Sequence, residues 1–345
     1  MTTSRRTLLK AGLAVAAATA LQPRASAQGG PVKIRYATGG GIGPNEMETI
    51  IYLEWMQKNV LKQYGRAYTV DMTFTRGTPE AATLLAAGQA DLATLAFSGF
   101  ATMIQKGVVP DGLSIIADNY QDARPGFAAN TFFVLEGSSY RNVADLRGKK
   151  IGINAFGSAV DLALRVYLKK NNLDARKDVE IVEIAFPNIG PALREKRIDC
   201  GVMVLPFMNN ELRKGGIRGL FTAADAFGGP YATIFQVATR TFIKEHRAAV
   251  AAFLSDYVVG LKWFYDPANR SRALDITAEF TKSPRDVLDS YFLTGKDYYR
   301  NRNACVDAGL IQGPVDAMLE QGLITAPLKI TDYIDGSLLP AGCGA

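Results

Sequence analysis

The chain has 345 residues, of which 48% are hydrophobic and 21% charged. This balance is typical of soluble globular proteins, and the length exceeds what one hydrophobic core usually accommodates, so we expect two lobes or domains. The formal net charge of +6 includes four basic and no acidic side chains within residues 1–28. The remaining 35 basic and 33 acidic residues nearly balance, which argues against a nucleic acid as partner.

Residues 1–27 have the organisation of an export signal. A basic stretch from Ser4 to Lys10 precedes an apolar run from Ala11 to Leu21, and Ala25-Ser26-Ala27 then offers a small-x-small cleavage pattern. The two adjacent arginines resemble a twin-arginine signal, with an ordinary Sec signal as the alternative. The apolar run is shorter than the roughly 20 residues that cross a bilayer. We therefore expect export to the periplasm and a mature chain that begins near Gln28.

From residue 32 onward, strand-like and helix-like runs alternate. The first block predicts strands at 32–37, 68–74, 91–97 and 113–120 and helices at 47–61 and 78–88. The pattern then restarts, with strands at 131–137, 151–156, 179–186, 200–207 and 233–239 and helices at 159–173 and 190–198. From Lys244 the chain becomes mostly helical. This alternation is typical of βαβ units, so we predict an α/β fold of two lobes with a cleft between them.

The stretch Tyr36 to Asn45, YATGGGIGPN, places four glycines between a predicted strand and a predicted helix. It does not fit the dinucleotide fingerprint G-x-G-x-x-G, because from Gly39 the third glycine comes one position early and from Gly41 the third position is Glu46. The Lys-Ser/Thr pair of a phosphate loop is missing. What remains is a turn at a helix N-terminus. It either binds a carboxylate, sulfonate or other small acceptor through its N–H groups, or binds nothing.

The residues that usually carry catalysis are sparse. The chain has one histidine, His246, at the start of a predicted basic helix, where a surface position is the simplest interpretation. This argues against imidazole-based metal sites and against Ser-His or Cys-His dyads, so we predict neither a metal nor enzymatic activity. Of the three cysteines, Cys200 fits a buried thiol, while Cys305 and Cys343 are either bridged or free. The composition favours binding over catalysis.

Four segments together carry a resemblance to a known family. They are RGTPEAATLLAAGQADLATLAFSG, the stretch from SSYRNVADLRGKKIGINAFGSAV to DVEIVEI, ALREKRIDCGVMVLPF, and LEQGLITAPLKITDYIDGSLL, at residues 76–99, 138–184, 192–207 and 319–339. In order and spacing they resemble the periplasmic substrate-binding proteins of ABC transporters, in the nitrate/sulfonate/taurine group that also includes pyrimidine-precursor binders. The similarity spans about residues 32–339.

The resemblance implies a type II periplasmic binding protein fold. One lobe would comprise residues 31–128 plus 236–345 and the other residues 129–235, with Thr131–Leu135 and Thr233–Ala238 as a two-strand hinge. Ligand would lie between strand-to-helix turns of both lobes, and hinge closure would bury it. The implied partners are a small solute and an ABC permease in the inner membrane, with the receptor a monomer that needs no cofactor.

The resemblance also implies which residues contact the ligand. Carried onto this sequence, the cleft turns contain Gly40, Gly41, Asn45, Arg76, Phe97, Ser98, Thr131, Ser158, Ala159 and Phe207. Ser98 and Ser158 are expected either to cradle an anion beside helix N–H groups or simply to cap helices. Arg76 is expected to pair with a carboxylate or sulfonate, unless it is solvated. The two phenylalanines would stack on a planar ligand or fill the core.

The leading hypothesis from the sequence is therefore a receptor for a small organic anion, a sulfonate or carboxylate whose body is either aromatic or aliphatic. The first turn lacks the family's aPl-x-x-A stretch, and the family's tryptophan is replaced within VMVLPF, which puts nitrate or taurine in doubt as ligand. Two alternatives stay open. One is an enzyme on the same fold, like the iron- and histidine-dependent pyrimidine synthases, and the other is a ligand-binding partner of a membrane sensor kinase.

Overall fold

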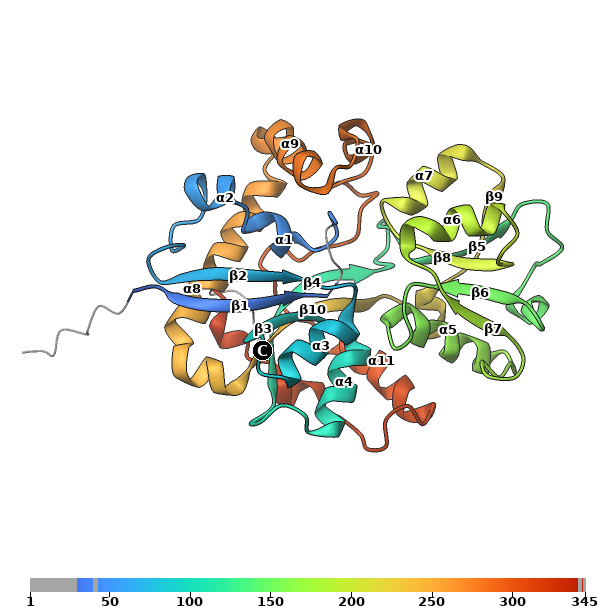
Figure 1. Ribbon diagram of the computed structural model, residues 1–345, viewed down its shortest axis with the longest axis horizontal. Helices are drawn as coiled ribbons and strands as arrows, with labels where there is room; N and C mark the ends of the chain where they lie inside the picture. The colour runs from blue at the N-terminus through green and yellow to red at the C-terminus, as the bar shows by residue number, and fades with distance from the viewer. Residues whose placement is uncertain (1–29, 40–42, 341–342, 344–345) are drawn as a thin grey trace, which may run out of the picture. The chain divides into compact units, whose positions relative to one another are not determined.

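The computed structural model describes residues 30–39, 43–340 and 343. Residues from Pro31 onward form one compact unit, built around two mixed β-sheets (Figure 1). The predicted export signal and Gly40 and Gly41 lie outside the described residues. In the part of the chain that is described, no helix combines the length and the apolar character needed to cross a membrane.

The first sheet has the strand order β2-β1-β3-β10-β4. Its strands are β1 (Val32–Thr38), β2 (Tyr68–Phe74), β3 (Leu92–Ala96), β4 (Leu113–Asp122) and β10 (Tyr231–Thr239). β1 pairs in parallel with β2 and β3, whereas β10 runs antiparallel between β3 and β4. Every residue of β3 and β4 is buried, because helices cover both faces of the sheet.

The second sheet has the order β7-β6-β8-β5-β9. Its strands are β5 (Thr131–Leu135), β6 (Lys150–Ile153), β7 (Glu180–Glu183), β8 (Cys200–Met203) and β9 (Ile217–Thr222). β6 pairs in parallel with β7 and β8, and β5 is antiparallel to β8 and β9. Each sheet thus has a parallel part and one antiparallel strand, β10 in the first sheet and β5 in the second. These two mixed sheets confirm the predicted α/β blocks.

Helices flank both sheets. Those that accompany the first sheet are α1 (Met47–Ile51), α2 (Glu54–Asn59), α3 (Thr78–Ala86), α4 (Phe97–Lys106), α8 (Arg240–Tyr265), α9 (Arg270–Thr281), α10 (Arg285–Asp289) and α11 (Gly309–Glu320). Those of the second are α5 (Ala159–Lys170), α6 (Phe186–Arg194) and α7 (Phe207–Lys214). Short 3-10 turns occur at Val143–Leu146, Ala223–Ala226, Pro267–Asn269, Ile330–Tyr333 and Gly336–Leu338.

The chain passes from the first sheet to the second and back through residues 123–130 and 223–230. The predicted limit between the two lobes, at residues 235 and 236, falls within β10. This strand pairs with first-sheet strands on both sides of the limit. The lobe limits and the hinge function of the two predicted strands stay predictions.

Several element predictions were wrong in detail. The predicted helix 47–61 is divided into α1 and α2, because Leu53 adopts extended backbone angles. Phe97, expected at the end of a strand, is the first residue of α4, and neither α4 nor β9 was predicted. The apolar residues of β3 continue into those of α4, FSGFATMIQ, without a polar break. Periodicity alone therefore does not show where the strand ends and the helix begins.

Candidate functional site

Asn45 connects the loop after β1 to the segment after β8. Its side-chain Nδ2 donates to the carbonyl oxygen of Leu205 at 2.7 Å. Asn45 follows a strand of the first sheet, whereas Leu205 follows a strand of the second. Its own carbonyl oxygen accepts a hydrogen bond from Arg300 at 3.0 Å. Of the predicted contacts in the first turn, Asn45 is therefore held between both halves of the protein.

The two predicted serines lie at neighbouring helix N-termini. The hydroxyl of Ser98, in the first turn of α4, donates to the carbonyl oxygen of Gly157 at 2.9 Å. Ser158 caps α5 by accepting from the N–H of Asp161 at 3.3 Å, and it donates to Asn154 at 2.9 Å. Ala159 follows as the buried first residue of α5. The structure thus brings Ser98 to the Gly157–Ala159 turn, with both hydroxyls donating to protein oxygens.

Arg76 lies apart from these contacts. Its side chain is 93% exposed, and its Nε is 3.2 Å from the carboxylate of Glu80, one helical turn later. Thr131 is half-buried at the start of β5, where its hydroxyl donates to the carbonyl oxygen of Ala129 at 2.9 Å. Phe207 is half-buried as the first residue of α7, directly after a cis Leu205–Pro206 bond.

Phe97 occupies the core. It is fully buried, and its ring packs edge-on against Phe227 and Tyr231 at centroid distances of 5.5 and 5.8 Å. In this conformation the Phe97 ring therefore has aromatic partners from the protein itself, which is the core-filling alternative of the sequence prediction.

A buried polar cluster connects the two passages between the sheets, and most of it was not predicted. We call it the crossover cluster and define it as Asp122, Asn130, Tyr231 and Tyr298, each at most 1% exposed. Asp122 Oδ1 accepts the Asn130 N–H at 2.8 Å. The Tyr298 hydroxyl donates to Asn130 Oδ1 at 2.6 Å and accepts the Leu205 N–H at 3.1 Å. The cluster thus joins the end of β4, the chain before β5, the segment after β8 and the C-terminal region.

Asp122 is the ionisable centre of the crossover cluster. It is the last residue of β4 and lies opposite Tyr231, the first residue of β10. Burial raises the pKa of Asp122 to about 7, against the opposing effects of the Asn130 N–H and the nearby Tyr231 hydroxyl. A sequence signal for this site exists. Polar side chains in ADNYQD continue a strand that is otherwise apolar, but the predicted strand ended at residue 120, before Asp122.

The buried side chain of Arg300 contacts the loop after β1. The side chain is fully buried and forms an ion pair with Asp297 at 2.8 Å. It also donates to the carbonyl oxygens of Pro44 and Asn45 at 3.5 and 3.0 Å, and its guanidinium carbon lies 5.9 Å from the ring centre of Tyr120. Buried charges are normally compensated in this way. The two terminal nitrogens of the guanidinium thus have protein partners, while its Nε is buried without a hydrogen-bond partner.

Two buried glutamates, Glu46 and Glu48, follow the same loop. Glu46 accepts the N–H of Gly39 at 3.2 Å, and Glu48 accepts the Thr94 hydroxyl at 2.6 Å and the Asn119 amide at 2.9 Å. Burial raises the pKa of Glu48, and the hydrogen bonds from Thr94 and Glu46 oppose that rise. The loop is thereby bordered by carboxyl groups.

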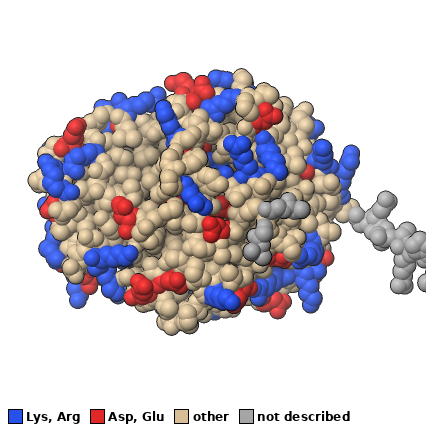
Figure 2. All heavy atoms as spheres, turned by 180° about the vertical axis from the view of Figure 1, so that it is seen from behind, with Lys and Arg blue, Asp and Glu red and all other residues tan. Residues whose placement is uncertain are grey.

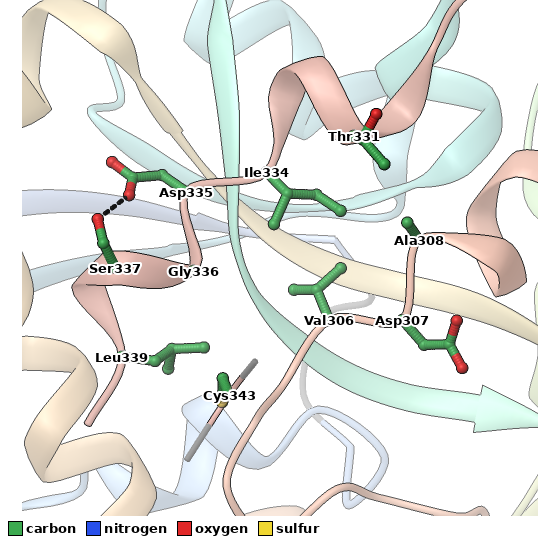
Figure 3. A pocket seen from close by; sticks show the side chains of 10 residues that line it. All are labelled: Val306, Asp307, Ala308, Thr331, Ile334, Asp335, Gly336, Ser337, Leu339 and Cys343. Carbon is green, nitrogen blue, oxygen red and sulfur yellow. Dashed lines mark hydrogen bonds between the residues drawn. The ribbon is translucent and has the colours of Figure 1, made fainter. Parts of the chain in front are cut away.

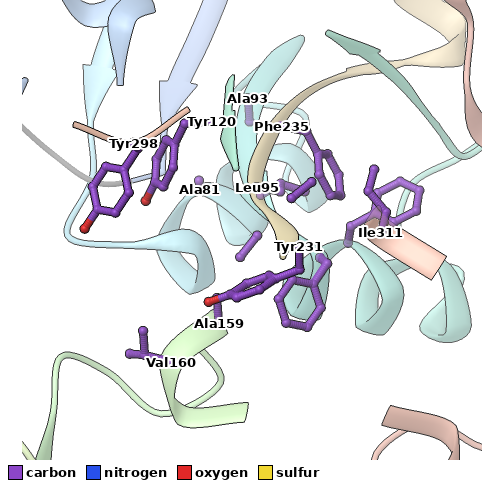
Figure 4. Packing of buried hydrophobic residues seen from close by; sticks show 14 of the residues in the cluster. Ala81, Ala93, Leu95, Tyr120, Ala159, Val160, Tyr231, Phe235, Tyr298 and Ile311 are labelled. Atoms are coloured by element: carbon purple, nitrogen blue, oxygen red, sulfur yellow. The ribbon is translucent and has the colours of Figure 1, made fainter. Parts of the chain in front are cut away.

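Three tyrosines surround the place where the first sheet meets α5 (Figure 4). The rings of Tyr120 and Tyr298 stack with centroids 4.8 Å apart, and their hydroxyl groups point the same way. The hydroxyl of Tyr231 points toward Ala159 at the start of α5. Asn45, the crossover cluster and the Ser98–Gly157 contact together form the candidate site, which is rich in hydroxyl, amide and carboxyl groups.

A separate cavity of about 730 Å³ lies near the C-terminus (Figure 3). It is lined by Val306, Asp307, Ala308, Thr331, Ile334, Asp335, Gly336, Ser337, Leu339 and Cys343. Its two carboxylates are paired with arginines, Asp307 with Arg124 at 3.5 Å and Asp335 with Arg247 at 3.0 Å. Beside it a disulfide joins Cys305 and Cys343, which decides the alternative that the sequence left open. Cys200 is a buried free thiol whose pKa is raised by burial.

Charged side chains of both signs are mixed on the face shown in Figure 2. Among the described residues, no group of three or more His, Cys, Asp or Glu side chains is arranged to hold a metal ion. His246 lies within α8, with its ring 4.8 Å from that of Phe242.

Comparisons with known proteins agree with this architecture. The model of the family described as NMT1-like matches residues 50–278. A Brucella abortus protein named "Putative binding protein" is 25% identical over 207 residues, which are 58% of this chain and 63% of that relative, less than two thirds of its length.

Two solved structures are similar in fold. The periplasmic aliphatic sulphonate binding protein SsuA of Escherichia coli has a TM-score of 0.64 at 20% identity, over 88% of this chain and 92% of that one. The alkanesulfonate-binding protein SsuA of Xanthomonas axonopodis pv. citri, bound to MOPS, has a TM-score of 0.68 at 18% identity, over 89% and 99%. Together with the sheet order, these likenesses confirm the predicted periplasmic binding protein fold.

Proposed function

This chain belongs to the NMT1-like family, whose model covers residues 50–278, and from that premise we propose that it is a periplasmic solute-binding receptor. It captures a small organic solute between its two lobes and delivers it to an ABC permease. The relatives and neighbours support the receptor class by their names, as proteins that bind. Export by the twin-arginine or Sec route and the monomeric state are parts of the proposal that rest on the sequence alone.

The observation that carries the proposal is the set of polar contacts between turns of the two halves. Asn45 reaches Leu205, Ser98 reaches Gly157, and Tyr298 reaches both Asn130 and Leu205. In open α/β sheets, ligands bind at the carboxyl ends of strands where such turns converge. Polar contacts between lobes favour a closed conformation, and a solute that binds this conformation better shifts the population toward it.

The composition of this chain argues against the enzyme alternative. The pyrimidine synthases named as an alternative depend on histidines and iron, whereas this chain has one histidine. That histidine lies in α8 with its ring 4.8 Å from that of Phe242. We propose binding without chemical conversion of the solute.

The anionic character expected of the solute needs separate support. The structural neighbours are named for aliphatic sulphonate and alkanesulfonate, and the sequence favoured a carboxylate or sulfonate. That expectation relied on Arg76 for charge, and the Arg76 side chain is exposed and paired with Glu80. The solute class is therefore argued below from the residues of this chain.

The receptor function is tested by thermal unfolding of protein purified from the periplasm, in the presence of a library of small metabolites. A solute at 100 times its dissociation constant stabilises the folded state by about 2.7 kcal/mol, which shifts the melting temperature by several degrees. Native mass spectrometry of the same preparation detects a solute that is retained through purification.

A matched pair of variants connects the result to the site. Ser98→Ala removes the hydrogen bond to Gly157 and is expected to weaken solute binding several-fold. Ser271→Ala, on the exposed side of α9, is the control and should bind as the unchanged protein does. Absence of both a melting shift and a retained solute would contradict the receptor function.

A further inference from the structure

Asp122 carries an oxygen that no protein donor satisfies. The residue is fully buried, and Oδ1 accepts the Asn130 N–H, but Oδ2 is buried without a hydrogen-bond partner. Buried carboxylate oxygens are costly to desolvate and nearly always have donors. The Tyr231 hydroxyl is near enough to lower the pKa of Asp122, but neither this hydroxyl nor Asp122 Oδ2 has a hydrogen bond of ordinary geometry.

Among the other buried atoms without a hydrogen-bond partner, Asn45 Oδ1 and the Tyr231 hydroxyl can accept, whereas Arg300 Nε is a donor. Tyr231, opposite Asp122 on β10, has a fully buried hydroxyl without a hydrogen bond, directed at the start of α5. Asn45 Oδ1 is buried and unpaired as well. Its amide orientation is set by the bond from Nδ2 to Leu205, which leaves the oxygen as the group to be satisfied. A run of hydrogen bonds through Leu205, Tyr298 and Asn130 connects Asn45 to Asp122.

The arginines near this place already have acidic partners. Arg300 is paired with Asp297 at 2.8 Å, and it uses further donors on loop carbonyl oxygens. Arg165, on α5, is paired with Asp161 at 2.8 Å. Apart from Arg300 Nε, which has no hydrogen-bond partner, an anionic solute would have to take these guanidinium donors from a buried carboxylate, which would leave that carboxylate unpaired.

Two of the nearby helix N-termini, those of α5 and α3, are occupied by carboxylates of the protein, whereas α4 and α7 have no acidic side chain in their first turns. At α5, Asp161 accepts the N–H of Gly157 at 2.8 Å. At α3, Glu80 accepts the N–H of Arg76 at 2.8 Å. Acidic side chains in the first turn neutralise the positive end of a helix, so an external anion gains less there and meets like charge.

From these observations we infer that the solute presents N–H donors, as an amide, amidine or amine, to Asp122, Tyr231 and Asn45. This inference rests on the proposed receptor function and specifies its ligand class. A donor group would complete the hydrogen bonding of Asp122 Oδ2 and Asn45 Oδ1, and a cationic one would also compensate the buried carboxylate. An anion in the same place would face the Asp122 carboxylate, while Arg300 and Arg165 are already paired with Asp297 and Asp161.

The test sorts the metabolite library by charge and donor content and includes matched series that share one body, such as benzoate, benzamide and benzamidine. Dissociation constants of all binders are then measured by calorimetry at pH 8. We expect binders among the amides, amidines and amines, with at least tenfold weaker binding of a cationic binder by Asp122→Asn. Tyr231→Phe should also weaken the binding of donor solutes. Asp332→Asn, which changes an exposed carboxylate far along the chain, should leave their binding unchanged.

Each outcome supports or overturns either this inference or the receptor function. If only anions bind, the receptor function stands and this inference is overturned, above all if Asp122→Asn binds them more tightly because a repelling charge is gone. If donor solutes bind but neither variant weakens them, the assignment to Asp122 and Tyr231 is overturned. If Asp122→Asn does not fold, as judged by circular dichroism, Tyr231→Phe decides in its place. If no class binds and no solute is retained, the receptor function itself fails.

Discussion

At the scale of single residues, Asp122 combines complete burial with an incomplete set of hydrogen bonds. If packing were the only requirement, an amide or an apolar residue would be more favourable at this position, because burying a carboxylate costs free energy. The residue nevertheless keeps one bond, to the Asn130 N–H, that orders the passage into β5. A structural task for Oδ1 and a binding task for Oδ2 account for both oxygens.

This assignment predicts how stability depends on pH. The pKa of Asp122 is about 7 in the folded protein, and an unfolded aspartate titrates near 3.9. Between these values the folded state binds more protons than the unfolded state, so the contribution of Asp122 to stability decreases as pH rises and levels off above about 7. Asp122→Asn removes this dependence. Relative to the variant, the unchanged protein should lose up to about 1.4 kcal/mol of stability per pH unit from pH 5 to 7.

The measurement is urea unfolding of solute-free protein and of Asp122→Asn at pH 5, 6, 7 and 8. Other buried acids, such as Asp118, whose pKa is also raised to about 7, contribute equally to both proteins and cancel in the difference. Asp332→Asn, at an exposed position, is the control and should follow the unchanged protein. Parallel stability curves for the protein and Asp122→Asn would show that Asp122 is ionised throughout this range.

At the scale of elements, the sequence predicted most strands and the parallel part of each sheet, because alternation and apolar runs report local burial. It did not predict α4, because FSGFATMIQ follows an apolar strand without a polar break. Nor did it predict the crossover cluster, whose members lie at positions 122, 130, 231 and 298 and meet only through the topology. Asn45, Ser98 and Ser158 were predicted from the resemblance, and their partners could not be, since each partner belongs to another element.

The glycines after β1 illustrate the same limit. Their number suggested a flexible turn, but the reason for Gly39 lies in packing against β3. A β-carbon at this position would come within 2.5 Å of the carbonyl oxygen of Thr94, a backbone atom that cannot move aside. At Gly43 an added β-carbon would meet nothing within 4 Å. One glycine is thus required by close approach of two elements and the other is not.

Gly39→Ala is therefore expected to destabilise the protein by about 1–3 kcal/mol, the usual cost of overpacking. The clash must be relieved by moving the loop after β1, which also displaces the N–H that Glu46 accepts. Gly43→Ala, four residues later in the same loop, is the matched control and should change stability by less than about 0.5 kcal/mol. Chemical unfolding of both variants measures the difference. Equal stabilities would mean that the loop relaxes without cost.

At the scale of the whole molecule, the lobes are connected in two ways. The chain itself crosses twice, through residues 123–130 and 223–230. Hydrogen bonds cross as well, and those of Tyr298 reach both a crossing segment, at Asn130, and the turn of the second sheet, at Leu205. In the hinge closure that we propose, these bonds would exist only when the turns are close, so they would contribute to the difference in free energy between closed and open conformations.

Tyr298→Phe tests this coupling with little damage to the core. The ring can keep its stacking on Tyr120, and only the hydroxyl with its bonds to Asn130 and Leu205 is lost. Two net hydrogen bonds are worth roughly 1–3 kcal/mol, so we expect solute affinity to fall about tenfold and the solute-free variant to populate the open form more. Small-angle scattering should then give a larger radius of gyration without solute and the same radius at saturation. Tyr299→Phe, at the neighbouring half-buried position whose ring packs against Phe127, is the control. If both variants bind and scatter like the unchanged protein, the Tyr298 bonds do not govern closure, and the contacts of Asn45 and Ser98 would have to supply it.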